Sequence, residues 1–100
     1  MTHLAERVLN IALIESSRTV QSAIMKLLEP RGYRVSGFTN PCEALASIAS
    51  DETFDGMITS AELSPISGIE LCWEARLLSA GRWPLYIIPY DVERGGREYN

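Results

Sequence analysis

Two short and almost entirely apolar runs place the tightest limit on how this chain can fold. They are VLNIALI, at residues 8–14, and GMIT, at residues 56–59. A strand with one face in water alternates apolar and polar residues, whereas a strand buried on both faces is apolar throughout. We therefore expect both runs to be central strands of a parallel sheet that is covered on both faces.

Three other segments have the residue spacing of helices. The first spans residues 17–29, where the apolar residues fall on one helical stripe. The second begins at Asn40, which together with Pro41 and Glu43 predicts an N-cap, a first-turn proline and a capping box. The third spans residues 68–79. Its predicted apolar side consists of Ile69, Cys72, Trp73 and Leu77.

Two weaker runs complete a regular alternation of strands and helices. YRVSGF, at residues 33–38, is polar enough for an edge strand, and PLYIIP, at residues 84–89, is a fourth strand. Short connections between alternating elements imply right-handed crossovers. The sequence thus predicts an α/β fold with a doubly wound parallel sheet, strand order 2-1-3-4, in one domain over residues 1–100.

Composition limits the classes of function. Of the 100 residues, 46% are hydrophobic and 22% are charged, as in ordinary globular domains. The net charge of -4 and the lack of a basic patch argue against direct binding of nucleic acid. No apolar run is long enough for a membrane span, and the N-terminal residues do not have the form of a signal peptide. With Cys42 and Cys72 as buried thiols, we expect a cytoplasmic protein that contacts no membrane.

Two stretches carry a resemblance to a known family. Residues 12–35, ALIESSRTVQSAIMKLLEPRGYRV, and residues 54–71, FDGMITSAELSPISGIEL, resemble the CheY-like receiver domains of bacterial response regulators. PLYII stands where that family has its fourth strand. The resemblance covers Leu9 to about Tyr90. It implies a flavodoxin-like sheet whose fifth strand and last helix are absent from this chain, which would then be the N-terminal part of a longer signalling protein.

The resemblance also assigns positions to the family's phosphorylation pocket. The acidic pair that holds magnesium falls on Glu15 and Ser16, and the phosphoacceptor aspartate falls on Ser60. The Thr or Ser after the fourth strand falls on Pro89, and the family's lysine has no counterpart, since the only lysine lies in the first helix. The resemblance therefore implies a degenerate phosphorylation pocket. Its members are Glu15, Ser16, Ser60, Glu62 and Pro89.

Neither metal binding nor catalysis is expected at this pocket. Magnesium commonly takes one or two carboxylates, and only Glu15 and Glu62 could supply them here. Asp55 lies five residues before Ser60, roughly 16 Å away along a strand. Ser60 has no adjacent base. We expect a non-enzymatic domain without a cofactor, in which Glu15 accepts hydrogen bonds from nearby amides and Ser60 bonds locally.

The favoured hypothesis is a degenerate receiver that acts in two-component or phosphorelay signalling through protein contacts, without phosphorylation. Its partners would be an attached output domain, another protein or a second copy. The fourth strand's edge or its flanking helix would carry the homodimer, with Trp83, Tyr86 and Tyr90 as candidate surface residues. Two alternatives remain open: a magnesium-dependent phosphorylated receiver with unusual residues, and a flavodoxin-like anion or cofactor binder with hydroxyls at Ser16, Ser17 and Thr19.

Overall fold

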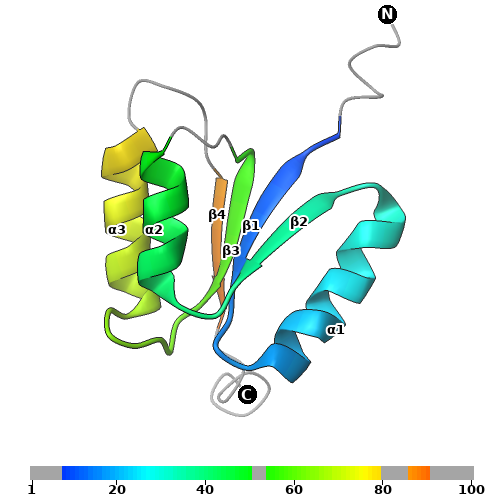
Figure 1. The fold of residues 1–100 in the computed structure, drawn as a ribbon, viewed down its shortest axis with the longest axis horizontal. Helices are drawn as coiled ribbons and strands as arrows, with labels where there is room; N and C mark the ends of the chain where they lie inside the picture. The colour runs from blue at the N-terminus through cyan, green and yellow to red at the C-terminus, as the bar shows by residue number, and fades with distance from the viewer. Residues whose placement is uncertain (1–7, 51–53, 80–85, 91–100) are drawn as a thin grey trace, which may run out of the picture.

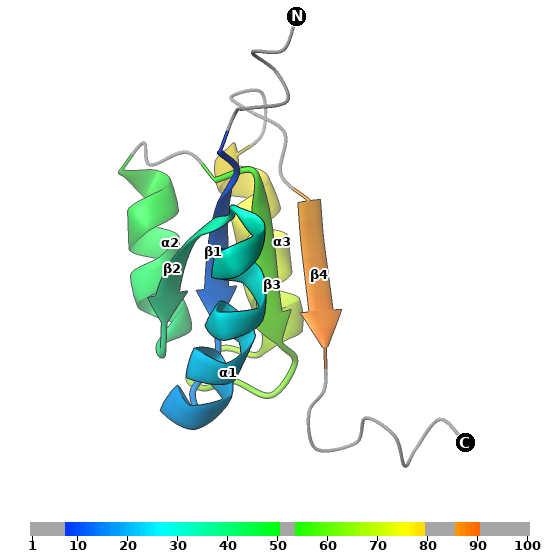
Figure 2. The ribbon, with the colours of Figure 1, turned by 90° about the vertical axis from the view of Figure 1, so that its right-hand side faces the viewer.

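A four-stranded parallel sheet forms the centre of the computed structural model, which describes residues 8–50, 54–79 and 86–90 (Figure 1). The strands are β1 (Asn10–Ile14), β2 (Arg34–Phe38), β3 (Gly56–Ser60) and β4 (Tyr86–Tyr90). Figure 2 shows them side by side in the order β2-β1-β3-β4, and every neighbouring pair is parallel. The predicted strand order is confirmed. The prediction about a fifth strand and last helix concerns residues outside the described ranges.

Helices cover both faces of the sheet. They are α1 (Arg18–Leu28), α2 (Pro41–Ala49) and α3 (Gly68–Ser79), with a short 3₁₀ turn, η1 (Glu29–Arg31), after α1. In Figures 1 and 2, α2 and α3 lie together on one face, and α1 lies on the other. This arrangement confirms the predicted doubly wound fold, and it leaves the carboxyl ends of all four strands at one end of the sheet.

The helix starts differ from the prediction in one respect. At α2, the Asn40 side chain accepts a hydrogen bond from the Cys42 amide at 2.7 Å, while the Glu43 amide bonds the Asn40 backbone carbonyl. The capping box predicted at Asn40 is therefore wrong. A reciprocal box forms at α3, where the Ser67 amide donates to Glu70 Oε1 at 3.0 Å and the Glu70 amide donates to Ser67 Oγ at 3.1 Å.

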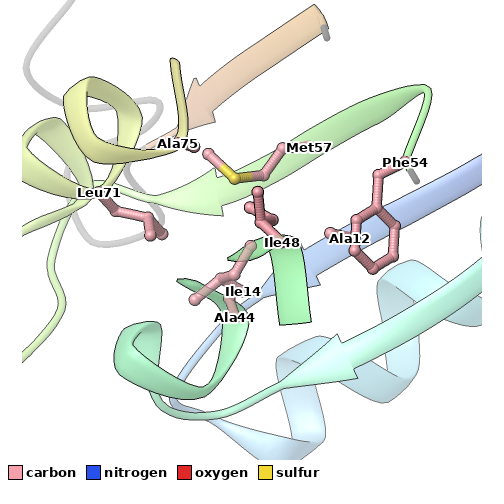
Figure 3. Close-up of a cluster of buried hydrophobic side chains, with 8 residues drawn as sticks. All are labelled: Ala12, Ile14, Ala44, Ile48, Phe54, Met57, Leu71 and Ala75. Carbon is pink, nitrogen blue, oxygen red and sulfur yellow. The ribbon is translucent and has the colours of Figure 1, made fainter. Parts of the chain in front are cut away.

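The hydrophobic core lies between the sheet and the pair α2–α3 (Figure 3). On β1, Leu13 is also fully buried, although it alternates with core residues and so points to the opposite face. This two-sided burial confirms β1 as a central strand. The residues of the core cluster are Ala12, Ile14, Ala44, Ile48, Phe54, Met57, Leu71 and Ala75.

The orientation of α3 contradicts the predicted apolar side. Its buried residues are Gly68, Leu71, Ala75 and Ser79. Three of the four are small, so the helix backbone approaches the sheet closely, and a prediction from large side chains selected the wrong face. Ile69, Trp73 and Leu77 are instead 56%, 69% and 67% exposed. Trp73 is therefore not a packing residue. Cys42 is exposed and Cys72 lies at the margin of the core, so the prediction that both thiols are buried is wrong.

β4 is the outermost described strand, and its backbone limits further pairing. The Tyr90 carbonyl accepts a hydrogen bond from the Ala61 amide at 2.6 Å, so the peptide groups of Tyr90 point toward β3. Because successive residues alternate, the backbone groups of Pro89 point away from β3. A proline has no N–H there to donate. Only Ile87 offers an outward amide at this edge of β4, which makes the edge a poor template for another strand.

The observed orientation of α3 predicts opposite results for two leucines on the same helix. Leu71→Ala should lower the free energy of unfolding by about 2–5 kcal/mol, because Leu71 is fully buried. Leu77→Ala should change it by less than ~0.5 kcal/mol, because Leu77 is 67% exposed. Urea unfolding followed by circular dichroism measures both. Equal losses would contradict the observed orientation.

Candidate functional site

The carboxyl ends of β1, β3 and β4 bring three polar side chains together at one end of the sheet. Glu15 follows β1 directly, Ser60 is the last residue of β3, and Tyr90 is the last residue of β4. The strand arrows in Figure 2 all point to this end of the sheet. In open parallel sheets, ligands bind just beyond the carboxyl ends of the strands, so these residues form the candidate site.

Glu15 is the buried carboxylate of this site. It is 5% exposed, and each of its carboxylate oxygens accepts a hydrogen bond from the protein. Oε2 accepts from the Ser17 amide at 2.8 Å, and Oε1 accepts from the Tyr90 hydroxyl at 2.6 Å. Its own amide donates to the Phe38 carbonyl at 2.9 Å. The expected bond from a nearby amide is present, and the tyrosine bond is an addition that the sequence did not reveal.

Tyr90 enters the site because β4 runs to residue 90, one residue beyond the predicted strand. Its side chain is half-buried. Burial raises the pKa of its phenol above the ordinary value, and the hydrogen bond to Glu15 and the charge of Glu15 raise that pKa further. The phenol is therefore protonated at neutral pH and can donate. The hydroxyl points inward to Glu15, so a role of Tyr90 at a partner surface stays a prediction.

Ser60 terminates β3 with a local hydrogen bond. The residue is 5% exposed, and its Oγ accepts from the Glu62 amide at 3.2 Å. The Glu62 side chain itself is exposed. The hydroxyl of the neighbouring Thr59, which is fully buried, donates to the Ser60 carbonyl at 3.0 Å. Ser60 thus has the bonding of a serine that closes a strand and begins a turn.

Gly68 holds the start of α3 against this turn. Its amide donates to the Ala61 carbonyl at 3.0 Å. A Cβ at this position would collide with the Ser60 carbonyl oxygen and would lie 2.8 Å from the Ala61 Cα. Both neighbours are backbone and cannot rotate away. A glycine is therefore required where α3 meets the end of β3.

The structure describes the other predicted site residues in less detail. Ser16 is exposed, and Pro89 lies in β4 with its backbone paired to Thr59. Trp83 lies outside the described residues, and Tyr86 is described only as part of the β4 backbone. Asp55 is at the opposite end of the sheet, where its Oδ2 accepts from the Asn10 amide at 2.8 Å. This position confirms that Asp55 cannot join the pocket.

The donor set at the site is poor for a metal ion. Glu15 is the only buried carboxylate among the residues that the structure describes, and both its oxygens already accept hydrogen bonds. Within the same residues, no three His, Cys, Asp or Glu side chains are grouped so that they could hold a metal. The residues present do not fit the magnesium site of the receiver family.

The described helices are all too short or too polar to cross a membrane.

Comparison of the sequence with known proteins yields one curated relative. It is the phosphoglycerate transport system transcriptional regulatory protein PgtA of Salmonella typhimurium, 40% identical over 63 residues. The match spans 62% of this chain but only 15% of that protein. No protein-family model matches the chain.

Solved structures show the same fold. A CheY-like receiver domain from Methylobacillus flagellatus superposes with a TM-score of 0.73 at 17% identity, over 83% of this chain and 70% of that one. One from Methanospirillum hungatei gives 0.72 at 23% identity, over 83% and 65%. The receiver domain of an HD-domain protein from Pseudomonas fluorescens gives 0.70 at 22%, over 81% and 58%. The chain has the receiver fold and spans part of each of these domains.

The bond between Tyr90 and Glu15 predicts an alkaline loss of stability. Since the folded state raises the pKa of Tyr90 above its ordinary value of 10.0, the unfolded chain releases this proton first as pH rises. The free energy of unfolding should therefore be unaffected by this group below about pH 10 and should fall above it. Tyr90→Phe should show a smaller fall than the wild type.

Urea unfolding between about pH 8 and pH 11 measures this difference. Tyr33→Phe is the matched control, because Tyr33 lies just before β2 at the other end of the sheet. If Tyr90→Phe and the wild type lose stability equally above pH 10, the bond has no influence on the titration.

Proposed function

We propose that this chain is a degenerate receiver domain of bacterial two-component or phosphorelay signalling, which works through protein contacts without being phosphorylated. The receiver fold supports the broad class. One observation carries the finer proposal. At the end of the sheet where a receiver would hold magnesium, each oxygen of the buried Glu15 carboxylate accepts a hydrogen bond, one from Ser17 and one from Tyr90. Ser60 stands where the phosphoacceptor aspartate would be.

The chemistry of phosphoryl transfer explains why this arrangement favours an inactive pocket. The transfer depends on positioning and on a metal that neutralises the developing charge. A metal at Glu15 would have to compete with two charge-assisted hydrogen bonds, each of which contributes about 1.5–3 kcal/mol. Ser60 carries no charge to offset that competition, and it cannot form an acyl phosphate. Its oxygen accepts from an amide and has no neighbouring base to activate it.

The proposed partners are proteins. They comprise an attached output domain, a separate signalling protein or a second copy, with no enzymatic reaction, cofactor or direct nucleic-acid contact in this domain. The curated relative is named a transcriptional regulator, which favours an output that controls transcription. The free thiols of Cys42 and Cys72 support a cytoplasmic location.

The proposal predicts that the chain gains no phosphoryl group from acetyl phosphate and magnesium. Ser60→Asp alone should remain almost inert, because Ser16 and Pro89 still occupy the positions of a metal ligand and a hydroxyl. Intact-mass spectrometry detects an adduct, and an active receiver treated in parallel shows that the reagents work. A phosphate adduct on the unmodified chain, mapped to Ser60, would overturn the proposal and support a phosphorylated receiver.

A triple substitution tests whether Tyr90 blocks the metal position. Ser16→Asp/Ser60→Asp supplies two carboxylates, but Tyr90 still bonds Glu15. Adding Tyr90→Phe frees Glu15 Oε1, and magnesium affinity should then rise at least tenfold over the double variant, or about 1.4 kcal/mol. Isothermal titration calorimetry measures both. Equal affinities would show that the tyrosine bond does not control metal binding.

A further inference from the structure

The helix α1 is attached to the sheet differently from α2 and α3. Three residues of α2 and four of α3 are buried, whereas none of the 11 residues of α1 is. Apolar burial therefore contributes less to the attachment of α1 than to that of the other two helices. Polar contacts near its first turn join α1 to the carboxyl ends of β1 and β2.

The side chain of Gln21 makes two of these contacts. Its Nε2 donates to the Phe38 carbonyl at 3.0 Å and to the Glu15 carbonyl at 3.3 Å. Both partners are backbone carbonyls, which can only accept, so the side-chain group that faces them is the NH2 with its two hydrogens. One side chain of α1 thus bridges the ends of two neighbouring strands.

These bonds hold the backbone on both sides of Glu15. Its amide donates to the Phe38 carbonyl at 2.9 Å, and its carbonyl accepts from Gln21. The Phe38 carbonyl accepts from both residues, which uses both of its lone pairs. Because both peptide groups of Glu15 are held, its side chain starts from a fixed position, from which the carboxylate reaches Ser17 and Tyr90 together.

The strand beneath Gln21 has a glycine at the point of closest approach. Gly37 lies inside β2, where it is paired with Leu13. A Cβ at Gly37 would collide with Gln21 Oε1 and would lie 2.7 Å from Gln21 Cδ, and the three atoms nearest to it all belong to Gln21. A glycine inside a strand commonly marks a site of close approach. Since the obstacle is a single flexible side chain, a Cβ here would displace the Gln21 amide and leave the backbone in place.

We propose that Gln21 is a positioning residue for the candidate site. By joining the ends of β1 and β2 to α1, it sets the backbone of Glu15 so that the carboxylate meets the Tyr90 hydroxyl, and Gly37 leaves the room that Gln21 needs. Gln21 and Tyr90 act on the same residue from two elements, one at its carbonyl and the other at its carboxylate. This role goes beyond the proposed function, because it concerns how the site is held and not whether the domain is phosphorylated.

A double-mutant cycle between Gln21 and Tyr90 tests the positioning role. Gln21→Met removes the donors but keeps an unbranched side chain of similar length, and it should raise the equilibrium constant of unfolding about tenfold. In the Gln21→Met background, Tyr90→Phe should raise this constant by a factor about three times smaller than in the wild type, because Glu15 is no longer held for the bond. Urea unfolding at neutral pH measures all four proteins.

Ile48→Val is the matched control for this cycle. Ile48 is fully buried in the core on the other face of the sheet, so its substitution should have the same effect with Gln21 or Met at position 21. Circular dichroism verifies that every variant is folded. If Tyr90→Phe also has the same effect in both backgrounds, Gln21 does not position Glu15, and the proposal is overturned.

Gly37→Ala tests the same contact from the strand. In the wild type it should raise the equilibrium constant of unfolding about as much as Gln21→Met does, because the new Cβ displaces the Gln21 amide. In a Gln21→Ala background the Cβ has room, and alanine loses less conformational freedom than glycine on folding, so the same change should no longer destabilise the protein. An equal loss of stability in both backgrounds would show that Gly37 does not serve Gln21 and would contradict the proposed arrangement.

Discussion

A buried carboxylate is stable only when its oxygens are hydrogen-bonded, and at Glu15 this requirement connects three parts of the chain. The Ser17 amide comes from the start of α1, the Tyr90 hydroxyl comes from the end of β4, and Glu15 itself ends the central strand β1. At the end of the sheet that carries the candidate site, internal hydrogen bonds therefore join β1, α1 and β4. A group that could serve as a metal ligand serves here as a structural acceptor.

Much of the fold could be predicted because the strongest physical signals are local. The apolar runs at β1 and β3 fixed the central strands, and the alternation of elements fixed their order. The buried face of α3 could not be obtained in the same way. Hydropathy favours large side chains, whereas Gly68, Ala75 and Ser79 are buried because they are small and let the helix lie close to the sheet. The Ser67–Glu70 capping box was readable from its spacing and was missed.

The candidate site was predictable only in part. Glu15 directly follows β1, and Ser60 ends β3. Both could be placed at the carboxyl end of the sheet from the pattern of strands alone. The bond between Glu15 and Tyr90 could not, because it joins residues 75 positions apart and depends on how far β4 extends. Such pairings are set by tertiary register. A tyrosine close to the end of a predicted strand was the one available signal.

The position of Pro89 has a consequence for how the sheet can grow. Its backbone faces outward from β4, and a proline has no N–H, so this edge lacks one of the hydrogen-bond donors that a neighbouring strand needs. A change to threonine would supply that donor. One residue therefore separates an edge that resists extension from one that another strand could join.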